Sequence, residues 1–404
     1  YDGDEALHDE GHRAPVVVLA SGPGGALASI DTSGRLLRWT ADGEATDLGW
    51  TTSSEAGWDS TGTLWVLDAG RLTRGGVEVP VDATGGHSLR VRGDRVVFGA
   101  GDAVSLIQSV ECDVVLNGIT GSVGLLPTLA ALESGATLAL ANKESLIVGG
   151  DVVLGAKVRP DQIVPVDSEH SALAQSLMAG THDEVATLIL TASGGPLRGR
   201  SPESLASVTP QEALAHPTWD MGLVVTTNSA TLVNKGLEVI EAHLLFDIPF
   251  KQIAVTVHPQ SVVHSLVEFH DGSTIAQASP PDMKVPIAWG LSWPNRTPDV
   301  MPGIDWSTSH TWTFEPLDEV AFPAVSLAKS AGERGGTFPA VFNAANEQAV
   351  HAFHRGEISL PGILDTIVHT LEDHESGEMS VEGVLEAERS ARERADQFIA
   401  SKRS

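Results

Sequence analysis

The chain has 404 residues, of which 42% are hydrophobic and 19% charged, so it can form roughly two or three domains with substantial cores. Its 53 acidic and 25 basic residues give a formal net charge of −28, which argues against nucleic acid or an anionic membrane as a partner. Cys112 is the single cysteine, so no intrachain disulfide can form, and this favours a reducing, cytoplasmic location.

Neither a membrane span nor a secretory signal is expected. No apolar run approaches the ~20 residues that a membrane-spanning helix needs. The stretch from Tyr1 to Glu5 is acidic, whereas a signal peptide begins with basic residues. The first residue is not methionine, which indicates a fragment or a processed chain.

Residues 1–98 predict a β-rich region of unknown role. Val16–Gly25 reads as a strand and a glycine-rich turn, but Ala26–Ile30 is too short for a phosphate-binding helix, so we expect a hairpin. Asp31–Trp39 and Asp59–Leu67 look like one repeated unit, typical of propeller-like blades. Further short runs predict strands at Ala45–Trp50, Arg71–Thr73, Val77–Val81, Ser88–Val91 and Arg95–Phe98.

Residues 99–150 predict the remnant of a nucleotide-binding α/β domain. A buried strand at Asp113–Leu116, a turn at Asn117–Gly124, a helix at Leu125–Ser134 and a strand at Thr137–Leu140 would form a β-α-β unit. The glycine-rich turn is either an anion-holding loop or simply a tight connection. Asn142-Lys-Glu144 follows the second strand, where open α/β sheets place ligands; the alternative is a strand-ending charge pair.

Asp167 and Glu169 are the first candidate metal ligands of a domain expected over residues 151–300. They follow the apolar run Gln162–Val166, which reads as the end of a buried strand. On extended chain, residues two apart point the same way, so both carboxylates would share one face with Ser168 turned aside. Such a pair needs a proton or a cation between its members, and oxygen-only ligation favours Mg²⁺ or Mn²⁺. An acidic, solvated strand end remains the alternative.

A helix is expected over Ala230–Phe246. On it Asn234, Lys235 and Glu238 lie three and four residues apart and share a face, so Glu238 would complete the carboxylate set while the other two hold an anion. Ser193, beside two glycines, and Ser229 add hydroxyl groups. The alternative is a solvated Lys–Glu pair on an ordinary helix.

The loop from His216 to Gly222 carries Trp219 and Met221, which suit a lid over a substrate or an anchor to the core.

Ile253–Val257, Val262–Phe269 and Thr274–Ala278 predict antiparallel strands, and His258 and His264 among them read as buried histidines rather than metal ligands.

A linker is expected at residues 301–315, followed by a helical domain over residues 316–404. Its helices are predicted at Val320–Ala331, at Phe342–His354 with Asn343 as the cap, at Leu360–His374 and at Val381–Ala400.

From about Gly101 onward the chain resembles the 1-deoxy-D-xylulose-5-phosphate reductoisomerase family of the non-mevalonate isoprenoid pathway. The matching strings are Asn117–Gly124, Ala141–Leu146, Pro165–His170, Ser193–Pro196, His216–Gly222, Asn228–Glu238, His258–Ser261 and Asn343–Glu347, in the family's order. The family's N-terminal G-x-T-G-x-x-G turn for NADPH has no counterpart in residues 1–98.

The resemblance implies an α/β plus α+β fold, with an antiparallel dimer sheet and a C-terminal helical domain. It implies NADPH-dependent reduction of a sugar phosphate after a metal-dependent isomerisation, in a cytoplasmic homodimer. Mn²⁺ or Mg²⁺ would be held by Asp167, Glu169 and Glu238. The substrate would contact those two glutamates and Lys143, Ser168, Ser193, His216, Ser229, Asn234 and Lys235. Lys143 and the metal ligands would be catalytic, the cofactor would contact Asn142, Glu144 and Gly222, and the lid would be Trp219 and Met221.

Three hypotheses stay open. The chain is a working reductoisomerase whose cofactor site is unconventional or completed by another chain, or a metal- and sugar-phosphate-binding remnant without redox activity, or a propeller-like binding module fused to such a remnant.

Overall fold

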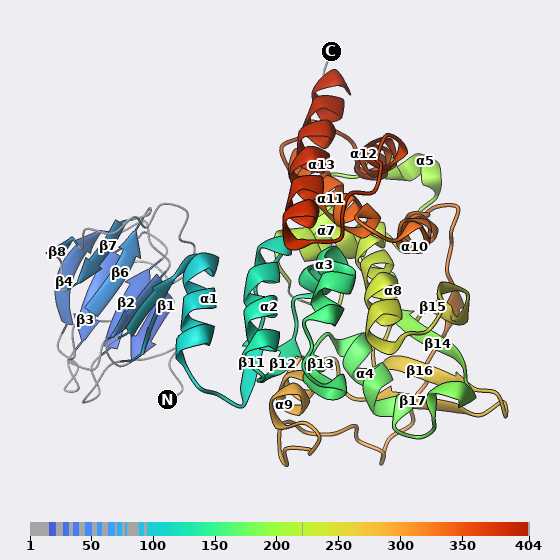
Figure 1. Cartoon of the computed structure of the whole chain (residues 1–404), viewed down its shortest axis with the longest axis horizontal. Coiled ribbons are helices and arrows are strands. Elements are labelled where there is room, and N and C mark those ends of the chain that lie inside the picture. Colours follow the sequence, from blue (N-terminus) through green and yellow to red (C-terminus); the bar gives the residue numbers. More distant parts are fainter. Residues whose placement is uncertain are drawn as a thin grey trace. The chain divides into compact units, whose positions relative to one another are not determined.

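The computed structural model describes the strands of residues 16–98 and the helical residues 99–102 by their backbone, and residues 103–402, except Asp220, with their side chains. The chain divides into two compact units, residues 1–111 and residues 112–404 (Figure 1). No helix in the described residues is both long and apolar enough to cross a membrane.

The smaller unit is built from antiparallel strands. It contains two four-stranded sheets, in the orders β1-β2-β3-β4 and β5-β6-β7-β8, a β9-β10 pair, and helix α1 (Gly99–Ser109). The strands are β1 (Val16–Ser21), β2 (Leu27–Asp31), β3 (Arg35–Trp39), β4 (Ala45–Trp50), β5 (Glu55–Trp58), β6 (Leu64–Asp68), β7 (Arg71–Arg74), β8 (Val77–Glu78), β9 (Leu89–Arg92) and β10 (Arg95–Phe98). β1 pairs antiparallel with β2, which confirms the expected hairpin. The propeller-like interpretation stays a prediction.

The larger unit begins with a parallel three-stranded sheet in the order β11-β12-β13. The strands β11 (Val114–Asn117), β12 (Thr137–Leu140) and β13 (Ile163–Pro165) are connected by α2 (Leu125–Glu133) and α3 (Lys143–Gly155). This confirms the β-α-β unit. The expected burial of its first strand was wrong, because β11 is an edge strand and Leu116 is 40% exposed.

The second sheet has five strands in the order β17-β16-β14-β15-β18. They are β14 (Val185–Ala192), β15 (Ile253–Val257), β16 (Val263–Phe269), β17 (Thr274–Ala278) and β18 (Glu315–Pro316). All three predicted strands are present, and β16 and β17 pair antiparallel as expected, but β15 does not join them and pairs antiparallel with β18 instead. It pairs parallel with β14, which separates it from the antiparallel β16 and β17. Helix α4 (Ser168–Leu177) packs on β16 and β17.

The predicted helix at Ala230–Phe246 is two helices. Leu232 has a φ of 60°, the left-handed conformation, and ends α7 (Leu223–Thr231) just before α8 (Val233–Phe246) begins. Leucine is a bulky apolar residue that rarely adopts a positive φ, so nothing in the sequence indicates a helix break at Leu232. The shorter helices are α5 (Pro202–Leu205), α6 (Pro210–Leu214) and α9 (Lys284–Ser292).

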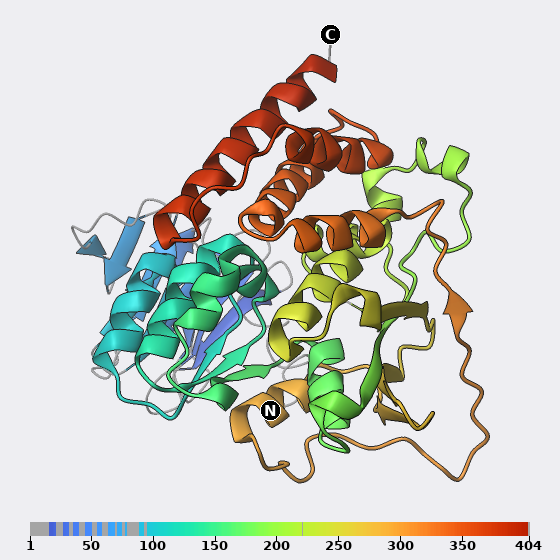
Figure 2. The same cartoon turned by 45° about the vertical axis from the view of Figure 1, so that its right-hand side comes forward.

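The C-terminal helices lie together at one end of the larger unit (Figure 2). They are α10 (Ala324–Arg334), α11 (Phe338–His354), α12 (Leu360–Glu372) and α13 (Val381–Lys402). α11 contacts the other three, and its Phe342 and Phe353 belong to the buried core. The proposed cap Asn343 was wrong, because α11 begins five residues earlier and Asn343 is buried inside it, bonded to Glu347.

Gly236 allows α10 to approach α8, the helix that carries three candidate site residues. A methyl group placed on Gly236 would lie 2.8 Å from the Ala328 Cβ and 3.0 Å from the Ala324 carbonyl oxygen. The two helices are therefore packed without room for a side chain at this position.

We expect Gly236→Ala to destabilise the protein. Alanine favours a helix by about 1 kcal/mol over glycine, but overpacking a core costs about 1–3 kcal/mol. Gly155→Ala is the matched control, because Gly155 ends α3 with no neighbouring atom within 4 Å. Urea denaturation should show a loss of stability for the first variant and none for the second; equal effects would contradict the packing argument.

Candidate functional site

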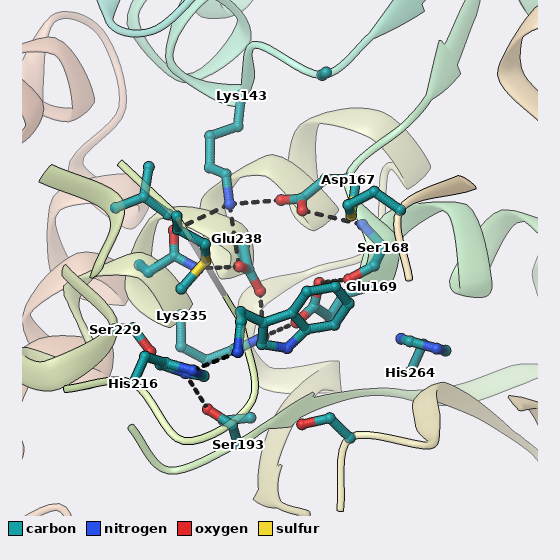
Figure 3. A pocket seen from close by; sticks show the side chains of 18 of the residues that line it. Lys143, Asp167, Ser168, Glu169, Ser193, His216, Ser229, Lys235, Glu238 and His264 are labelled. Carbon is teal, nitrogen blue, oxygen red and sulfur yellow. Dashed lines mark hydrogen bonds and ion pairs between the residues drawn. The ribbon is translucent and has the colours of Figure 1, made fainter. Parts of the chain in front are cut away.

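The ends of β12 and β13 and the helix α8 surround one cavity of about 300 Å³ in the larger unit. This volume lies at the lower end of the range of small-molecule sites. Most of the side chains proposed from the sequence line it: Lys143, Glu144, Asp167, Ser168, Glu169, Ser193, His216, Trp219, Met221, Ser229, Asn234, Lys235 and Glu238. Figure 3 shows the labelled members of this set pointing toward one another.

Asp167 and Glu169 reach the cavity by a different local structure from the one expected. The chain is not extended here: Asp167 is the N-cap of α4, and its Oδ1 accepts a 3.0 Å hydrogen bond from the backbone N–H of Ser168. Glu169 lies in the first turn of the helix, and the Ser168 hydroxyl donates to it over 2.6 Å. The strand-alternation argument was therefore wrong, although both carboxylates do face one site.

The three candidate ligands converge. One carboxylate oxygen from each of Asp167, Glu169 and Glu238 lies within 4.8 Å of the other two. Glu238 is 1% exposed and sits between the two lysines in Figure 3. These are oxygen donors only, as a hard divalent cation prefers.

Two buried lysines neutralise part of this negative charge. Lys143 Nζ lies 2.5 Å from Asp167 Oδ2 and 3.1 Å from Glu238 Oε1. Lys235 Nζ donates to Glu169 Oε1 over 2.7 Å and also to Glu238. Three carboxylates against two ammonium groups leave a net charge of about −1, with each lysine counted at its usual charge. The donor set therefore fits a divalent cation, which would reverse the sign of the site.

The pKa shifts follow from this arrangement. Burial alone would raise the pKa of Asp167, but Lys143 and His170 hold it well below its usual value. Burial and the neighbouring Glu169 raise the pKa of Glu238. A carboxylate that is buried next to a like charge is a group whose charged form a bound cation would stabilise.

A second part of the cavity suits an anion. Gly194 and Gly195 have φ angles of 85° and 67°, and the turn that they form places Ser193 beside Ser229 and Lys235. Backbone N–H groups in such a turn can approach an oxyanion closely. Asn234 donates to Glu238 and accepts from Lys143 over 3.1 Å, so it lies at the junction with the carboxylates.

His216 connects the anion side to the following loop. Its Nδ1 accepts from the backbone N–H groups of Thr218 and Trp219, over 3.2 and 2.9 Å, so this nitrogen carries no proton. Burial lowers the pKa of His216, which favours the neutral ring. Its Nε2–H can then donate to the Ser193 hydroxyl at 3.0 Å.

The cofactor residues proposed from the sequence are only partly brought together. Glu144 lines the cavity, whereas Gly222 caps α7 and does not. Asn142 is buried behind the cavity wall, where its amide donates to the Gly121 carbonyl over 3.0 Å and to Glu144 over 2.9 Å. Its contact with a cofactor would therefore be indirect.

Sequence reasoning missed several residues that line the cavity. These are Gly118, Ile119, Thr120, Ala141, Thr191, Ala192, Val225, Leu232, Ser261, His264 and Met283. His264 is buried and hydrogen-bonded to Ser279, as expected for a histidine of this sheet, but its ring also lies 6.5 Å from that of Trp219. The glycine-rich turn at Asn117–Gly124 was an available signal for Gly118, Ile119 and Thr120, and the family strings Ala141–Leu146 and His258–Ser261 were a signal for Ala141 and Ser261.

The carboxyl ends of parallel strands here carry carboxylate oxygens beside a glycine turn that suits an anion. This arrangement is typical of metal-assisted enzymes that act on small phosphorylated molecules. Family models support a more specific assignment. Residues 87–150 match 1-deoxy-D-xylulose 5-phosphate reductoisomerase, residues 163–246 match its C-terminal domain, and residues 278–394 match the DXP reductoisomerase C-terminal domain.

Curated relatives and solved structures point to the same family as these models. The reductoisomerase of Leifsonia xyli is 68% identical over 76% of this chain and 84% of its own, and that of Pseudarthrobacter chlorophenolicus is 61% identical over 84% and 89%. The Zymomonas mobilis enzyme in complex with NADPH is 39% identical with a TM-score of 0.70, covering 79% and 81%. A DOX-P reductoisomerase in complex with NADPH, fosmidomycin and magnesium is 35% identical with a TM-score of 0.70, covering 78% and 81%. The chain belongs to the 1-deoxy-D-xylulose 5-phosphate reductoisomerase family.

We expect Gly195→Ala to disturb the anion-binding turn through the backbone of α7. An added methyl group would lie 2.6 Å from the Ser229 carbonyl oxygen. Gly199→Ala is the control, because Gly199 also has a positive φ of 80° but no atom within 4 Å. Both variants carry the left-handed penalty of about 1–2 kcal/mol, and overpacking should add about 1–3 kcal/mol at the first site only. Equal losses in chemical denaturation would contradict this.

Proposed function

We propose that this chain isomerises 1-deoxy-D-xylulose 5-phosphate and reduces the product with NADPH to 2-C-methyl-D-erythritol 4-phosphate. The convergence of three carboxylates and two lysines beside an anion-binding turn is the observation that carries the proposal. Family membership and solved relatives that contain NADPH and magnesium support it.

Asp167, Glu169 and Glu238 would hold Mg²⁺ or Mn²⁺. A divalent cation supplies Lewis-acid stabilisation of negative charge that develops on substrate oxygens. NADPH supplies the hydride.

The remaining site residues bind and orient the substrate. Ser193, Ser229 and Lys235 would hold the phosphate, with His216 and Asn234 beside them, so that binding energy from the unreactive end fixes the reactive end. Lys143 lies between the carboxylates and the cofactor side, where its ammonium group would donate to substrate hydroxyls together with Ser168. Trp219 and Met221 would cover the cavity and exclude water.

A second candidate function is metal and sugar-phosphate binding without reduction. The described strands of residues 1–98 favour it, because β1 and β2 form an antiparallel hairpin where a dinucleotide-binding unit would have a β-α-β crossover. A third, recognition by a propeller-like N-terminal module, draws only on the paired four-stranded sheets. NADPH absorbance with substrate and Mn²⁺ measures the first function, and calorimetry with fosmidomycin and Mn²⁺ but no NADPH measures the second.

We also propose a cytoplasmic homodimer. β17 is the edge of the five-stranded sheet, and its first three side chains, including Ile275 at 39% exposure, face solvent. An exposed strand edge with apolar side chains can pair with another copy. Sedimentation analysis should give twice the chain mass, and Ile275→Asp should shift the equilibrium toward the monomer; a monomeric wild type would contradict the proposal.

We expect Asp167→Asn to weaken Mn²⁺-dependent fosmidomycin binding by more than about a hundredfold, because residues that only orient metal ligands already contribute about 10–100-fold. The fold should persist. Asp183→Asn is the control, because the Asp183 side chain is fully exposed and outside the site. Calorimetry measures both variants, and unchanged affinity for Asp167→Asn would contradict the ligand assignment.

A further inference from the structure

Behind the three carboxylates lies a fully buried pair that the proposed mechanism does not use. His170 of α4 and Glu241 of α8 are both 0% exposed. His170 Nδ1 lies 3.3 Å from Glu241 Oε2 and 3.7 Å from Asp167 Oδ2. The opposite nitrogen, Nε2, lies 2.8 Å from the carbonyl oxygen of Glu238.

The partners of the His170 ring determine where its protons lie. The Glu238 carbonyl oxygen can only accept, so the His170 Nε2 carries a proton and donates it. Nδ1 and the facing Glu241 oxygen are both acceptors unless one proton lies between them, so the contact holds one shared proton. The ring is therefore held at both nitrogens.

Glu241 has no other role in the described part of the chain. Apart from the 3.3 Å contact with His170 Nδ1, neither of its carboxylate oxygens has a polar partner there. A buried carboxyl group without partners is costly, and replacing a buried ionic pair by apolar side chains is often neutral or stabilising. Stability therefore gives no reason for a carboxyl group at this position.

Its neighbour His170 joins the two segments that carry the candidate ligands. Nε2 holds the main chain of α8 at Glu238, while Nδ1 faces Asp167 at the start of α4. The imidazole thus spans the gap between two elements that are far apart in the sequence. A rotation of the ring would break the hydrogen bond to the Glu238 carbonyl and would at the same time move Nδ1 away from Asp167.

We propose that Glu241 is a positioning residue that acts through His170 to hold Asp167 and Glu238 in the arrangement that binds the cation. Residues that orient metal ligands are part of a metal site as much as the ligands are. This inference rests on the proposed metal site.

The test is the affinity of the protein for Mn²⁺ without substrate or cofactor, followed by the electron paramagnetic resonance signal of free Mn²⁺. Glu241→Leu keeps the volume and removes the carboxylate that faces His170 Nδ1. We expect its dissociation constant for Mn²⁺ to rise by about 10–100-fold, with thermal stability kept or increased. Glu241→Gln should restore most of the affinity, because its amide N–H can donate to Nδ1 while Nε2 still donates to Glu238.

Glu388→Leu is the matched control. Glu388 is another buried helical carboxylate, 5% exposed, but it pairs with Arg392 on α13 and does not line the cavity. Its removal should leave the Mn²⁺ affinity unchanged. If Glu241→Leu does not fold, Glu241→Met is measured in its place with the same expectation.

The possible failures are distinguishable. If the wild type binds no Mn²⁺, the proposed metal site fails. If the wild type binds Mn²⁺ and Glu241→Leu binds it equally well, the positioning role is wrong. A stoichiometry of two Mn²⁺ per chain that falls to one in Glu241→Leu would also overturn it, because Asp167, His170 and Glu241 would then hold a cation themselves.

Discussion

The site depends on the repulsion among three carboxylates and on the cations that relieve it. Asp167, Glu169 and Glu238 come from α4 and α8, and carboxylates this close need a proton or a positive charge between them. Lys143 and Lys235 provide that charge from α3 and α8. This differs from the exposed pairs on α13, such as Arg389 with Glu386, where solvent screens the charges and little stability is expected. The buried cluster couples three elements, and it remains one positive charge short of neutrality.

This balance also bears on the proposed anion site at Ser193. With a divalent cation added, the cluster would carry about one net positive charge, which favours a phosphorylated ligand on a chain whose overall charge is −28. The sign of the charge around the cavity, rather than the net charge of the chain, therefore decides what the cavity can bind. The glycine turn at Ser193 adds N–H groups without adding side-chain bulk.

Much of the fold and most of the site could be predicted from the sequence, because short motifs carried the information. The strands and helices of residues 113–140 and the C-terminal helices follow from apolar periodicity. Asp167, Glu169 and Glu238 could be grouped from chemistry and resemblance, although the reason given for the first two was wrong. Asp167 is a helix cap and Glu169 lies in the first helical turn, so the two carboxylates meet at the start of α4 and not on one face of a strand. Function was thus easier to predict here than local backbone geometry.

What could not be predicted depends on long-range packing. The left-handed Leu232 is set by the fit of α7 and α8 against their neighbours, not by its own preference. The pairing of His170 with Glu241 joins residues on two helices, and neither residue has a local pattern that reveals the other. The place of β15 in the sheet depended on β14, a strand that is its neighbour in space but far from it in the sequence.

The two halves of the reaction therefore place different demands on this chain. The proposed cation and anion sites use side chains from Lys143 to Glu238, all inside one compact unit. Hydride transfer also needs a surface for the nicotinamide and the pyrophosphate. Of the residues proposed for the cofactor, Glu144 lines the cavity, as does the turn from Gly118 to Thr120, and Asn142 donates to the Gly121 carbonyl. Because the proposed metal and substrate residues all lie within residues 112–404, the proposed isomerisation site can be tested separately from the place where NADPH binds.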